Sequence, residues 1–335
     1  MGKNSLSICI PTYNRENYLN ELLKSIESQI TESIIDSVQI CISDNASTDN
    51  TETMVKKWQN STNLKIIYSK NKTNIGPDLN YLKSVSIADG EFCWLMGSDD
   101  QIKEGAIQYV LEEIKSGYDI YLCNRTECDI NMKPEDEKKW LNPKIKDTKF
   151  DFSNLNDQYN YYNYAQSLGA VFSYLSCIIV NRNKWNEIKY DAKYTGSAYS
   201  HVFILLSILN NHGKLKYIYN SLILCRGDND SFLSGGLVGR YLIDYDGYLM
   251  LANDFYSENI DLRNSFLKIL TRERRLRNLI YLGLQVKSDS DRKSLELRVR
   301  QIPYNYIERL IFSLCSRFPF RIKILTAIKQ LFRIL

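Results

Sequence analysis

Between residues 6 and 123 the sequence alternates short apolar runs with longer amphipathic segments, and this alternation constrains the fold more than any other feature. The apolar runs predict buried strands and the amphipathic segments predict helices. The expected strands are 6–11, 38–43, 64–69, 92–96 and 120–124, and the expected helices are 18–29, 51–59, 79–88 and 106–114. This order predicts an α/β fold with a mostly parallel central sheet and helices on both faces.

Polar clusters follow three of the expected strands: PTYNR at 11–15, SDNASTDN at 43–50 and GSDD at 97–100. The carboxyl ends of parallel strands meet at one edge of a sheet, where ligands bind, so we expect the clusters to converge. In the third cluster Asp99 and Asp100 are adjacent. Two ionised carboxylates about 4 Å apart repel by roughly 4 kcal/mol at an effective dielectric constant near 20, so solvent, a proton or a cation must compensate.

The composition excludes some functions and compartments. With 335 residues, 44% of them hydrophobic and 24% charged, the chain is ordinary globular material, and its net charge of +4 is too small to indicate a nucleic-acid partner. The eight cysteines lie mostly in apolar runs without a CxxC pair or zinc spacing, which predicts buried thiols in a reducing compartment. The absence of a signal-like or membrane-spanning segment predicts a cytoplasmic protein.

The second half of the chain is less regular. Residues 131–160 resemble a long surface excursion, and from about residue 238 the pattern becomes helical and increasingly basic. In between we expect one or two strands at 171–182, a buried helix at 201–209 and a hairpin or strand pair at 214–227. We therefore expect an α/β domain at 1–237 and a helical C-terminal region at 238–335.

Four motifs in order carry a family resemblance: ICIPTYNR (8–15), CISDNASTDNT (41–51), NIGPDLN (74–80) and GSDD (97–100). Together they resemble the family 2 glycosyltransferases, enzymes with the GT-A fold, over roughly residues 5–226. The stretches FSYLSC, SAYSHVFILL and CRGDNDSF are similar to the abequosyltransferases of bacterial O-antigen synthesis. The resemblance implies a nucleotide-sugar donor, with a CDP-sugar such as CDP-abequose favoured, a polyprenyl-diphosphate-linked oligosaccharide acceptor, and Mg²⁺ or Mn²⁺.

The first two motifs supply candidate nucleotide contacts. In the cluster formed by Pro11, Thr12, Tyr13 and Arg15, assigned to donor binding, the tyrosine ring is suited to stacking on a nucleobase. A strand-end turn is the alternative. Asp44 is suited to accepting a hydrogen bond from a uracil or cytosine edge, with a turn or helix cap as the alternative.

Two later motifs supply further donor-binding candidates. In NIGPDLN, Asn74, Gly76 and Asp78 form a tight turn that can face the ribose or the sugar. In CRGDNDSF, Arg226 is suited to holding a phosphate and Asp228 an acceptor hydroxyl, although a charged surface loop with an internal ion pair is equally compatible.

The resemblance gives GSDD a metal role. Asp100 is expected to bind Mg²⁺ or Mn²⁺ directly, and Asp99 to bind the ribose or assist the metal, because magnesium typically uses one or two carboxylates together with substrate phosphates. An acidic surface turn is the alternative. The family more often has a third acid where this chain has Ser98. We therefore expect weak metal affinity without the nucleotide.

The chain departs from the family at the catalytic base. Inverting members usually place a Glu-Asp pair at the start of a helix where this sequence has Ser200 and His201. With an ordinary pKa near 6.5, His201 is a candidate general base, and a buried structural or acceptor-binding histidine is the alternative. Asp191 is the second candidate, and a retaining enzyme needs no such base.

The C-terminal segment 305–335 is basic and amphipathic. It has six basic residues against one acidic residue, and apolar side chains recur at spacings of three and four from 324 to 335. Such helices bind the membrane interface, which favours peripheral attachment to the cytoplasmic face of the inner membrane; packing against the catalytic domain or a second subunit is the alternative. The competing functions are a noncatalytic nucleotide-sugar scaffold and, with less support, a nucleotidyltransferase.

Overall fold

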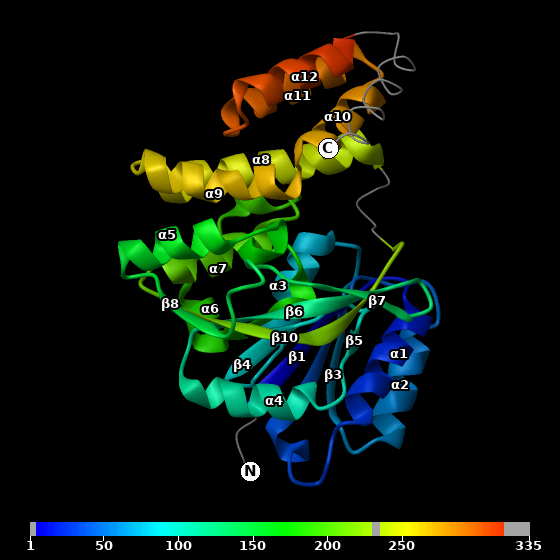
Figure 1. The fold of residues 1–335 in the computed structure, drawn as a ribbon. Coiled ribbons are helices and arrows are strands. Elements are labelled where there is room, and N and C mark those ends of the chain that lie inside the picture. Colours follow the sequence, from blue (N-terminus) through cyan, green and yellow to red (C-terminus); the bar gives the residue numbers. More distant parts are fainter. Residues whose placement is uncertain (1–4, 230–234, 318–335) are drawn as a thin grey trace. The chain divides into compact units, whose positions relative to one another are not determined.

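The computed structural model describes residues 5–229 and 235–317. The chain forms two compact units, residues 1–229 and 230–335, and each is described by itself. The first is an α/β unit and the second is helical (Figure 1). Helix α8 begins at Gly236, so the expected boundary at residue 237 falls in its first turn.

A single sheet organises the first unit, with strand order β3-β2-β1-β4-β9-β6-β10-β5. Strands β1 to β4 are parallel to one another where they pair, β10 runs parallel to β6, and β9 runs antiparallel to both β4 and β6. The strands of this path are β1 Leu6–Thr12, β2 Val38–Asp44, β3 Lys65–Lys70, β4 Phe92–Leu95, β5 Gln101–Ile102, β6 Ile120–Cys128, β9 Ile178–Asn181 and β10 Lys214–Arg226. The expected mostly parallel α/β sheet is confirmed.

Helices cover the sheet as the alternation predicts. Right-handed crossovers place α1 (Glu16–Glu27) and α2 (Thr51–Ser61) on one face, because β1, β2 and β3 follow one another in one direction. The next crossover reverses direction, so α3 (Pro77–Ser86) covers the other face against β1 and β2. Helix α4 (Ala106–Glu113) follows β5. The four helices expected between residues 18 and 114 are thereby confirmed.

The segment 131–181 contains more regular structure than expected. It forms β7 (Pro134–Lys138), β8 (Thr148–Asp151) and α5 (Leu155–Tyr164) before β9. Within 171–182, where one or two strands were expected, the structure has one strand, β9 (Ile178–Asn181). Residues 168–171 and 175–177 form short 3₁₀ turns. The buried helix expected at 201–209 is confirmed as α7 (Ser200–Asn210), which follows α6 (Arg182–Glu187).

The hairpin or strand pair expected at 214–227 is wrong. Residues Lys214–Arg226 form one strand, β10, whose register against β6 shifts between Ile218 and Ile223. This irregularity lets one end of β10 pair with β8 and the other end with β5. The residues between Ile218 and Ile223 therefore form a bulge within one strand.

Five helices form the described part of the second unit: α8 Gly236–Tyr256, α9 Ile260–Glu273, α10 Leu276–Gln285, α11 Asp289–Gln301 and α12 Tyr306–Arg317. Helix α12 packs on α10 through Cys315, Ile280 and Leu284. Among the described residues, no helix combines the length and the apolar character that crossing a membrane requires. The part of the basic tail from residue 318 onward lies outside the described residues.

All eight cysteines are buried as free thiols, as the apolar runs predict.

Candidate active site

Parallel pairing brings the polar clusters to one edge of the sheet. Thr12 at the end of β1 lies opposite Asp44 at the end of β2, and β4 pairs with the other side of β1. Beyond the strands, the Asn14 amide donates to Ser47 Oγ at 2.8 Å, and the Thr48 amide donates to Asn14 Oδ1 at 2.8 Å. The first two motifs are thus hydrogen-bonded to each other.

Asn45 joins the second motif to the third. Its side-chain amide donates to Asn74 Oδ1 at 2.8 Å, and its own Oδ1 accepts from the Ile75 amide at 2.8 Å. An ion pair of 2.5 Å between Arg15 and Asp99 joins the first motif to the fourth. Four segments that are far apart in sequence therefore form one connected site, as expected from the sequence.

The two adjacent carboxylates have different partners. Asp99 pairs with Arg15 and also accepts a hydrogen bond from Asn229 Nδ2 at 2.6 Å. Asp100 is 5% exposed, and its Oδ2 accepts hydrogen bonds from the hydroxyl groups of Tyr174, at 2.7 Å, and Ser176. Among the described residues, no lysine or arginine side chain forms an ion pair with Asp100.

Burial, followed by the negative charge of Asp99, raises the pKa of Asp100 to about 6. The hydrogen bonds from Ser176, Tyr174 and the Arg226 backbone oppose this shift without cancelling it. The charge of Asp100 is therefore compensated by dipoles only. A cation bound at this position would relieve the repulsion that the sequence places here.

The absence of a side chain at Gly97 lets three oxygen atoms lie close to the backbone. An ideal Cβ on this residue would lie 3.0 Å from Asp100 Oδ2, 3.2 Å from Asp99 Oδ1 and 3.2 Å from Ser176 Oγ. Three oxygen atoms thus surround a position that any side chain would fill. Magnesium and manganese prefer oxygen ligands, so this donor set fits the expected ion. The part of the chain that the structure describes has no group of three or more His, Cys, Asp or Glu side chains that could hold a metal.

The proposed nucleobase contacts differ in exposure. Tyr13 is 44% exposed at the sheet edge, where its ring is free to stack. Asp44 has no exposed surface, and its two oxygens accept from the Ser47 amide at 2.8 Å and the Tyr68 hydroxyl at 2.5 Å. Thr12 is also buried, and its Oγ1 has no hydrogen-bond partner in the described structure. Base recognition by Asp44 stays a prediction, and in this arrangement its carboxylate organises the strand end.

The NIGPDLN turn has one structural and one exposed part. Gly76 has a φ of +83°, which favours glycine, and precedes α3. Asn74 is exposed beside it. Asp78 is buried, however, and accepts hydrogen bonds from the Gly196 and Ala198 amides at 2.7 and 3.1 Å and from the Ser200 hydroxyl. Its carboxylate holds the loop before α7, so we no longer assign Asp78 to the ribose or sugar.

Arg226 forms the internal ion pair that was the alternative to phosphate binding. Its guanidinium group pairs with Glu21 and donates to the Asp99 and Ile130 carbonyls at 3.0 and 2.6 Å. Because each of the three nitrogens donates within the protein, we no longer assign Arg226 to a phosphate. The arginine instead fixes the backbone at Asp99. Asp228 is exposed, with a φ of 54°, and its acceptor contact stays a prediction.

His201 does not have the surroundings of a general base. The residue is 4% exposed, Nε2 donates to the Phe172 carbonyl at 2.9 Å, and Nδ1 is buried without a partner in the described structure. Burial lowers the pKa of His201, so the ring is neutral and packs edge-on against Tyr81. A general base must come within hydrogen-bond reach of the acceptor hydroxyl, and the His201 ring is instead buried against the protein in this structure. The structural alternative for His201 is therefore the one that the geometry favours.

Asp191 is accessible but tightly held. Its Oδ1 accepts from the Lys193 amide at 3.0 Å, and its carboxylate pairs with Lys193 Nζ at 3.2 Å. The backbone hydrogen bond, followed by the lysine contacts, lowers the pKa of Asp191. The residue stays a candidate base, although its lowered pKa makes it a weak one.

Sequence reasoning missed the residues that hold Asp100. Tyr174 and Ser176 come from FSYLSC, which was singled out only as part of a resemblance. Arg125 supports this pair, because its guanidinium carbon lies 4.0 Å from the Tyr174 ring centroid and 5.0 Å from that of Trp140. A long-range contact of this kind leaves no spacing pattern. Only the hydroxyl-rich composition of FSYLSC offered a signal.

Sequence comparison finds relatives that match these motifs. Residues 7–166 match the family model described as Glycosyl transferase family 2. Abequosyltransferase RfbV of Salmonella typhimurium is 47% identical over 272 residues, covering 80% of this chain and 80% of the relative. The GalNAc(5)-diNAcBac-PP-undecaprenol beta-1,3-glucosyltransferase of Campylobacter jejuni is 26% identical over 255 residues, covering 76% of this chain and 74% of the relative.

Solved structures share the fold at low sequence identity. S. aureus TarS 1-349 in complex with UDP-GlcNAc has a TM-score of 0.63 and 18% identity, covering 89% of this chain and 82% of that chain. Mannosyltransferase PcManGT from Pyrobaculum calidifontis, in complex with GDP-Man and Mn²⁺, has a TM-score of 0.54 and 12% identity, covering 96% of this chain and 89% of that chain. These likenesses confirm the expected GT-A fold.

Proposed function

The chain belongs to glycosyl transferase family 2 and is a nucleotide-sugar-dependent glycosyltransferase, and we propose that it transfers a 3,6-dideoxyhexose such as abequose. In this proposal the donor is a CDP-sugar, the acceptor is a polyprenyl-diphosphate-linked oligosaccharide of O-antigen synthesis, and Mg²⁺ or Mn²⁺ assists the reaction. The 47% identity to an abequosyltransferase supports the choice of sugar.

One observation carries the proposal: a buried carboxylate without a cationic partner lies at the edge where four motifs meet. Asp100 and Asp99 would hold the ion, with Gly97 leaving room for it and Ser176 and Tyr174 fixing the Asp100 carboxylate. A bound divalent ion would neutralise the charge that grows on the diphosphate as the glycosyl bond breaks. Tyr13 would stack on the base of the same nucleotide.

Two arginines of the chain hold Asp99 in position. Arg15 compensates the charge of Asp99 and ties the base-binding cluster to the metal carboxylates at a separation of 2.5 Å. Arg226, held by Glu21, fixes the Asp99 backbone, so the acidic turn cannot move independently of β10. Fixed positions matter because electrostatic stabilisation of a leaving group is strongest when ligands need not reorganise.

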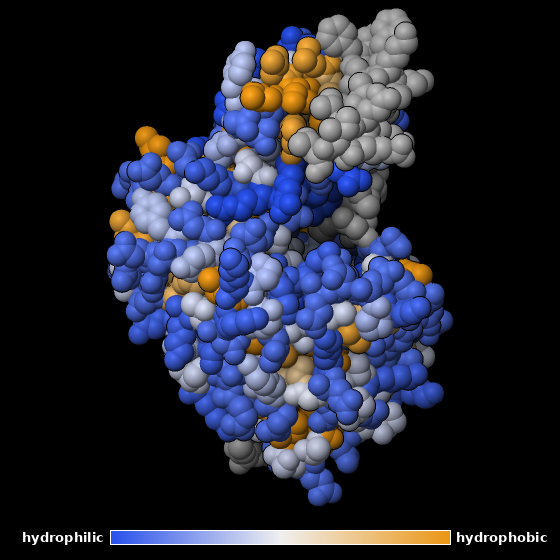
Figure 2. Space-filling model, in the orientation of Figure 1, coloured by the Kyte–Doolittle hydropathy of each residue, from blue (hydrophilic) through white to orange (hydrophobic). Residues whose placement is uncertain are grey.

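Peripheral membrane attachment is part of the proposal. Helix α12 exposes Tyr306, Ile307, Leu310 and Leu314, with exposed fractions of 78%, 64%, 45% and 43%. In the space-filling view, hydrophobic residues gather on the surface of the helical unit near this helix (Figure 2). Exposed apolar side chains in such a row typically mark a contact surface. The relative from Campylobacter jejuni has an undecaprenol-linked compound in its name, which supports a lipid-linked acceptor for this chain too.

We expect CDP to stabilise the protein more than UDP, GDP or TDP, and only when Mn²⁺ is present. A ligand that binds only the folded state raises the free energy of unfolding by about 2.7 kcal/mol at 100 times its dissociation constant, and this raises the unfolding temperature. A thermal-shift panel with and without Mn²⁺ measures this. A larger shift with UDP would contradict the CDP-sugar donor, and equal shifts without the ion would contradict the metal role.

Turnover separates this function from its alternatives. Incubation with CDP-sugar and acceptor should release CDP with time, whereas a nucleotidyltransferase would release pyrophosphate and a scaffold would release neither.

A further inference from the structure

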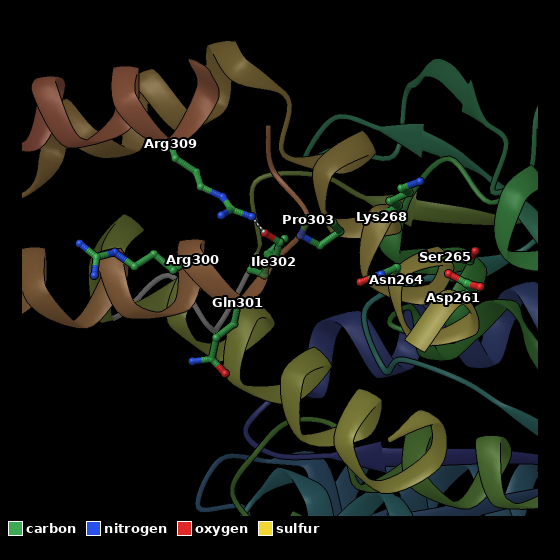
Figure 3. Close-up of a pocket in the computed structure, with 9 residues that line it drawn as sticks. All are labelled: Asp261, Asn264, Ser265, Lys268, Arg300, Gln301, Ile302, Pro303 and Arg309. Atoms are coloured by element: carbon green, nitrogen blue, oxygen red, sulfur yellow. Dashed lines mark hydrogen bonds between the residues drawn. The ribbon is translucent and has the colours of Figure 1, made fainter. Parts of the chain in front are cut away.

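The helical unit contains a pocket of about 460 Å³ that the proposed donor site does not use. It lies between α9, the end of α11, the turn at 301–303 and the beginning of α12 (Figure 3). Pockets of about 300–1,000 Å³ accommodate small molecules. The volume is therefore sufficient for a small ligand or the headgroup of a larger one.

The lining of this pocket is cationic and lacks ion pairs. Lys268, Arg300 and Arg309 line it together with a single carboxylate, Asp261. None of these four side chains forms an ion pair with another described residue. Four other arginines of the same unit form ion pairs. The pairs are Arg240 and Arg274 with Asp244, Arg298 with Asp246, and Arg317 with Glu296. The pocket lining therefore carries three cationic side chains against one carboxylate.

Arg309 shows most clearly that a partner is missing. Its Nη2 donates to the Ile302 carbonyl at 3.1 Å, as Figure 3 shows, whereas its Nε is buried with no hydrogen-bond partner in the described structure. A buried donor left unsatisfied destabilises the folded protein, and more so when the group is charged. An anion that contacts the guanidinium group would add hydrogen bonds to this arginine. Ser265, on the α9 side, adds a neutral hydroxyl.

We propose that this pocket binds the diphosphate group of the lipid-linked acceptor. Its positive charge selects a phosphate-bearing ligand, since arginine and lysine pair strongly with phosphate oxygens. Tyr306 and Ile307 lie in the same first turn of α12 as Arg309 and are exposed, so an apolar chain attached to the anion has a surface to contact. The identity of the ligand as the acceptor rests on the proposed function, whereas the anion site rests on the pocket alone.

Calorimetric titration of the full chain with farnesyl diphosphate, a soluble polyprenyl diphosphate, tests the proposal. Titrations contain no divalent cation, so that an ion at Asp100 cannot recruit the diphosphate. The double variant Lys268→Gln/Arg309→Gln should bind farnesyl diphosphate at least about 10-fold more weakly than wild type. Lys293→Gln, which changes an exposed and unpaired lysine of α11, is the matched control and should bind as wild type does. Equal affinity in the wild type and the double variant would overturn the proposal.

Further probes identify the source of the anion. Inorganic pyrophosphate should show the same loss in the double variant, because the pocket recognises the anion. Phosphatidylglycerol vesicles should bind the wild type and the double variant equally. If the double variant lost only vesicle binding, the pocket would recognise a bilayer headgroup and the proposal would fail. The double variant should bind CDP with Mn²⁺ as the wild type does. If the wild type itself did not bind CDP with Mn²⁺, the proposed donor site would be contradicted, whereas the proposal for the pocket would stand.

Discussion

Replacing Asp100 with asparagine should reduce glycosyl transfer at least about 100-fold, equivalent to about 2.7 kcal/mol of transition-state stabilisation. Asparagine keeps an oxygen that can accept the hydrogen bonds from Tyr174 and Ser176 but removes the charge that would bind the cation. Initial rates of CDP release from a CDP-sugar at saturating Mn²⁺ measure the effect. Asp36→Asn, at an exposed carboxylate, is the control and should retain wild-type activity.

The same substitution should not destabilise the protein near pH 7.5. Folding raises the pKa of Asp100 from its ordinary value of 3.8 to about 6. A carboxyl group whose pKa is higher in the folded state lowers the free energy of unfolding. This loss increases as the pH rises from 3.8 to about 6 and is constant above that pH. Asp100→Asn removes this loss but places an NH2 group opposite the Arg226 amide, which donates to Oδ1 at 3.3 Å in the wild type. Its unfolding temperature should therefore stay close to that of the wild type near pH 7.5 and should fall relative to the wild type toward about pH 5. A variant that loses activity by unfolding, or that remains fully active, would contradict this assignment.

Replacing Gly97 with alanine should weaken Mn²⁺ binding in the presence of CDP about 10-fold. The new methyl group would lie 3.0–3.2 Å from oxygens of Asp99, Asp100 and Ser176, so the carboxylates that are proposed to hold the ion would have to shift. Because Gly97 is not among the residues with positive φ, the substitution does not strain the backbone. Electron paramagnetic resonance titration of free Mn²⁺ measures the affinity.

Gly239→Ala is the matched control for this experiment, since its Cβ would meet no atom within 4 Å. Gly97→Ala should unfold within a few degrees of wild type. Unchanged Mn²⁺ affinity in Gly97→Ala would place the ion elsewhere.

The sequence predicted the sheet and its functional edge because both depend on local patterns. Buried strands such as Phe92–Leu95 read as apolar runs, and the polar residues that follow them lie at the carboxyl ends by geometry alone. The parallel order of β3, β2, β1 and β4 then brings Arg15 to Asp99. Neither step required information on distant contacts.

The sequence was least informative where the surroundings of a side chain or strand depend on tertiary contacts. Asp78 looked like a ligand contact in a turn, but the amides of Gly196 and Ala198, more than a hundred residues away, occupy its carboxylate. His201 looked like a base because of its ordinary pKa, which burial then lowers. The mistaken hairpin at 214–227 has the same origin, since β10 is continuous only because β8 and β5 pair with its two ends. No pattern within a segment reports such partners.

Anomalous diffraction at the manganese edge, from crystals grown with CDP and Mn²⁺, tests the central assignment most directly. We expect one manganese peak bonded to a carboxylate oxygen of Asp100 and to diphosphate oxygens of CDP, with the base next to Tyr13. A nucleotide bound at this edge with manganese coordinated only by other residues, or a nucleotide bound elsewhere on the chain, would contradict it.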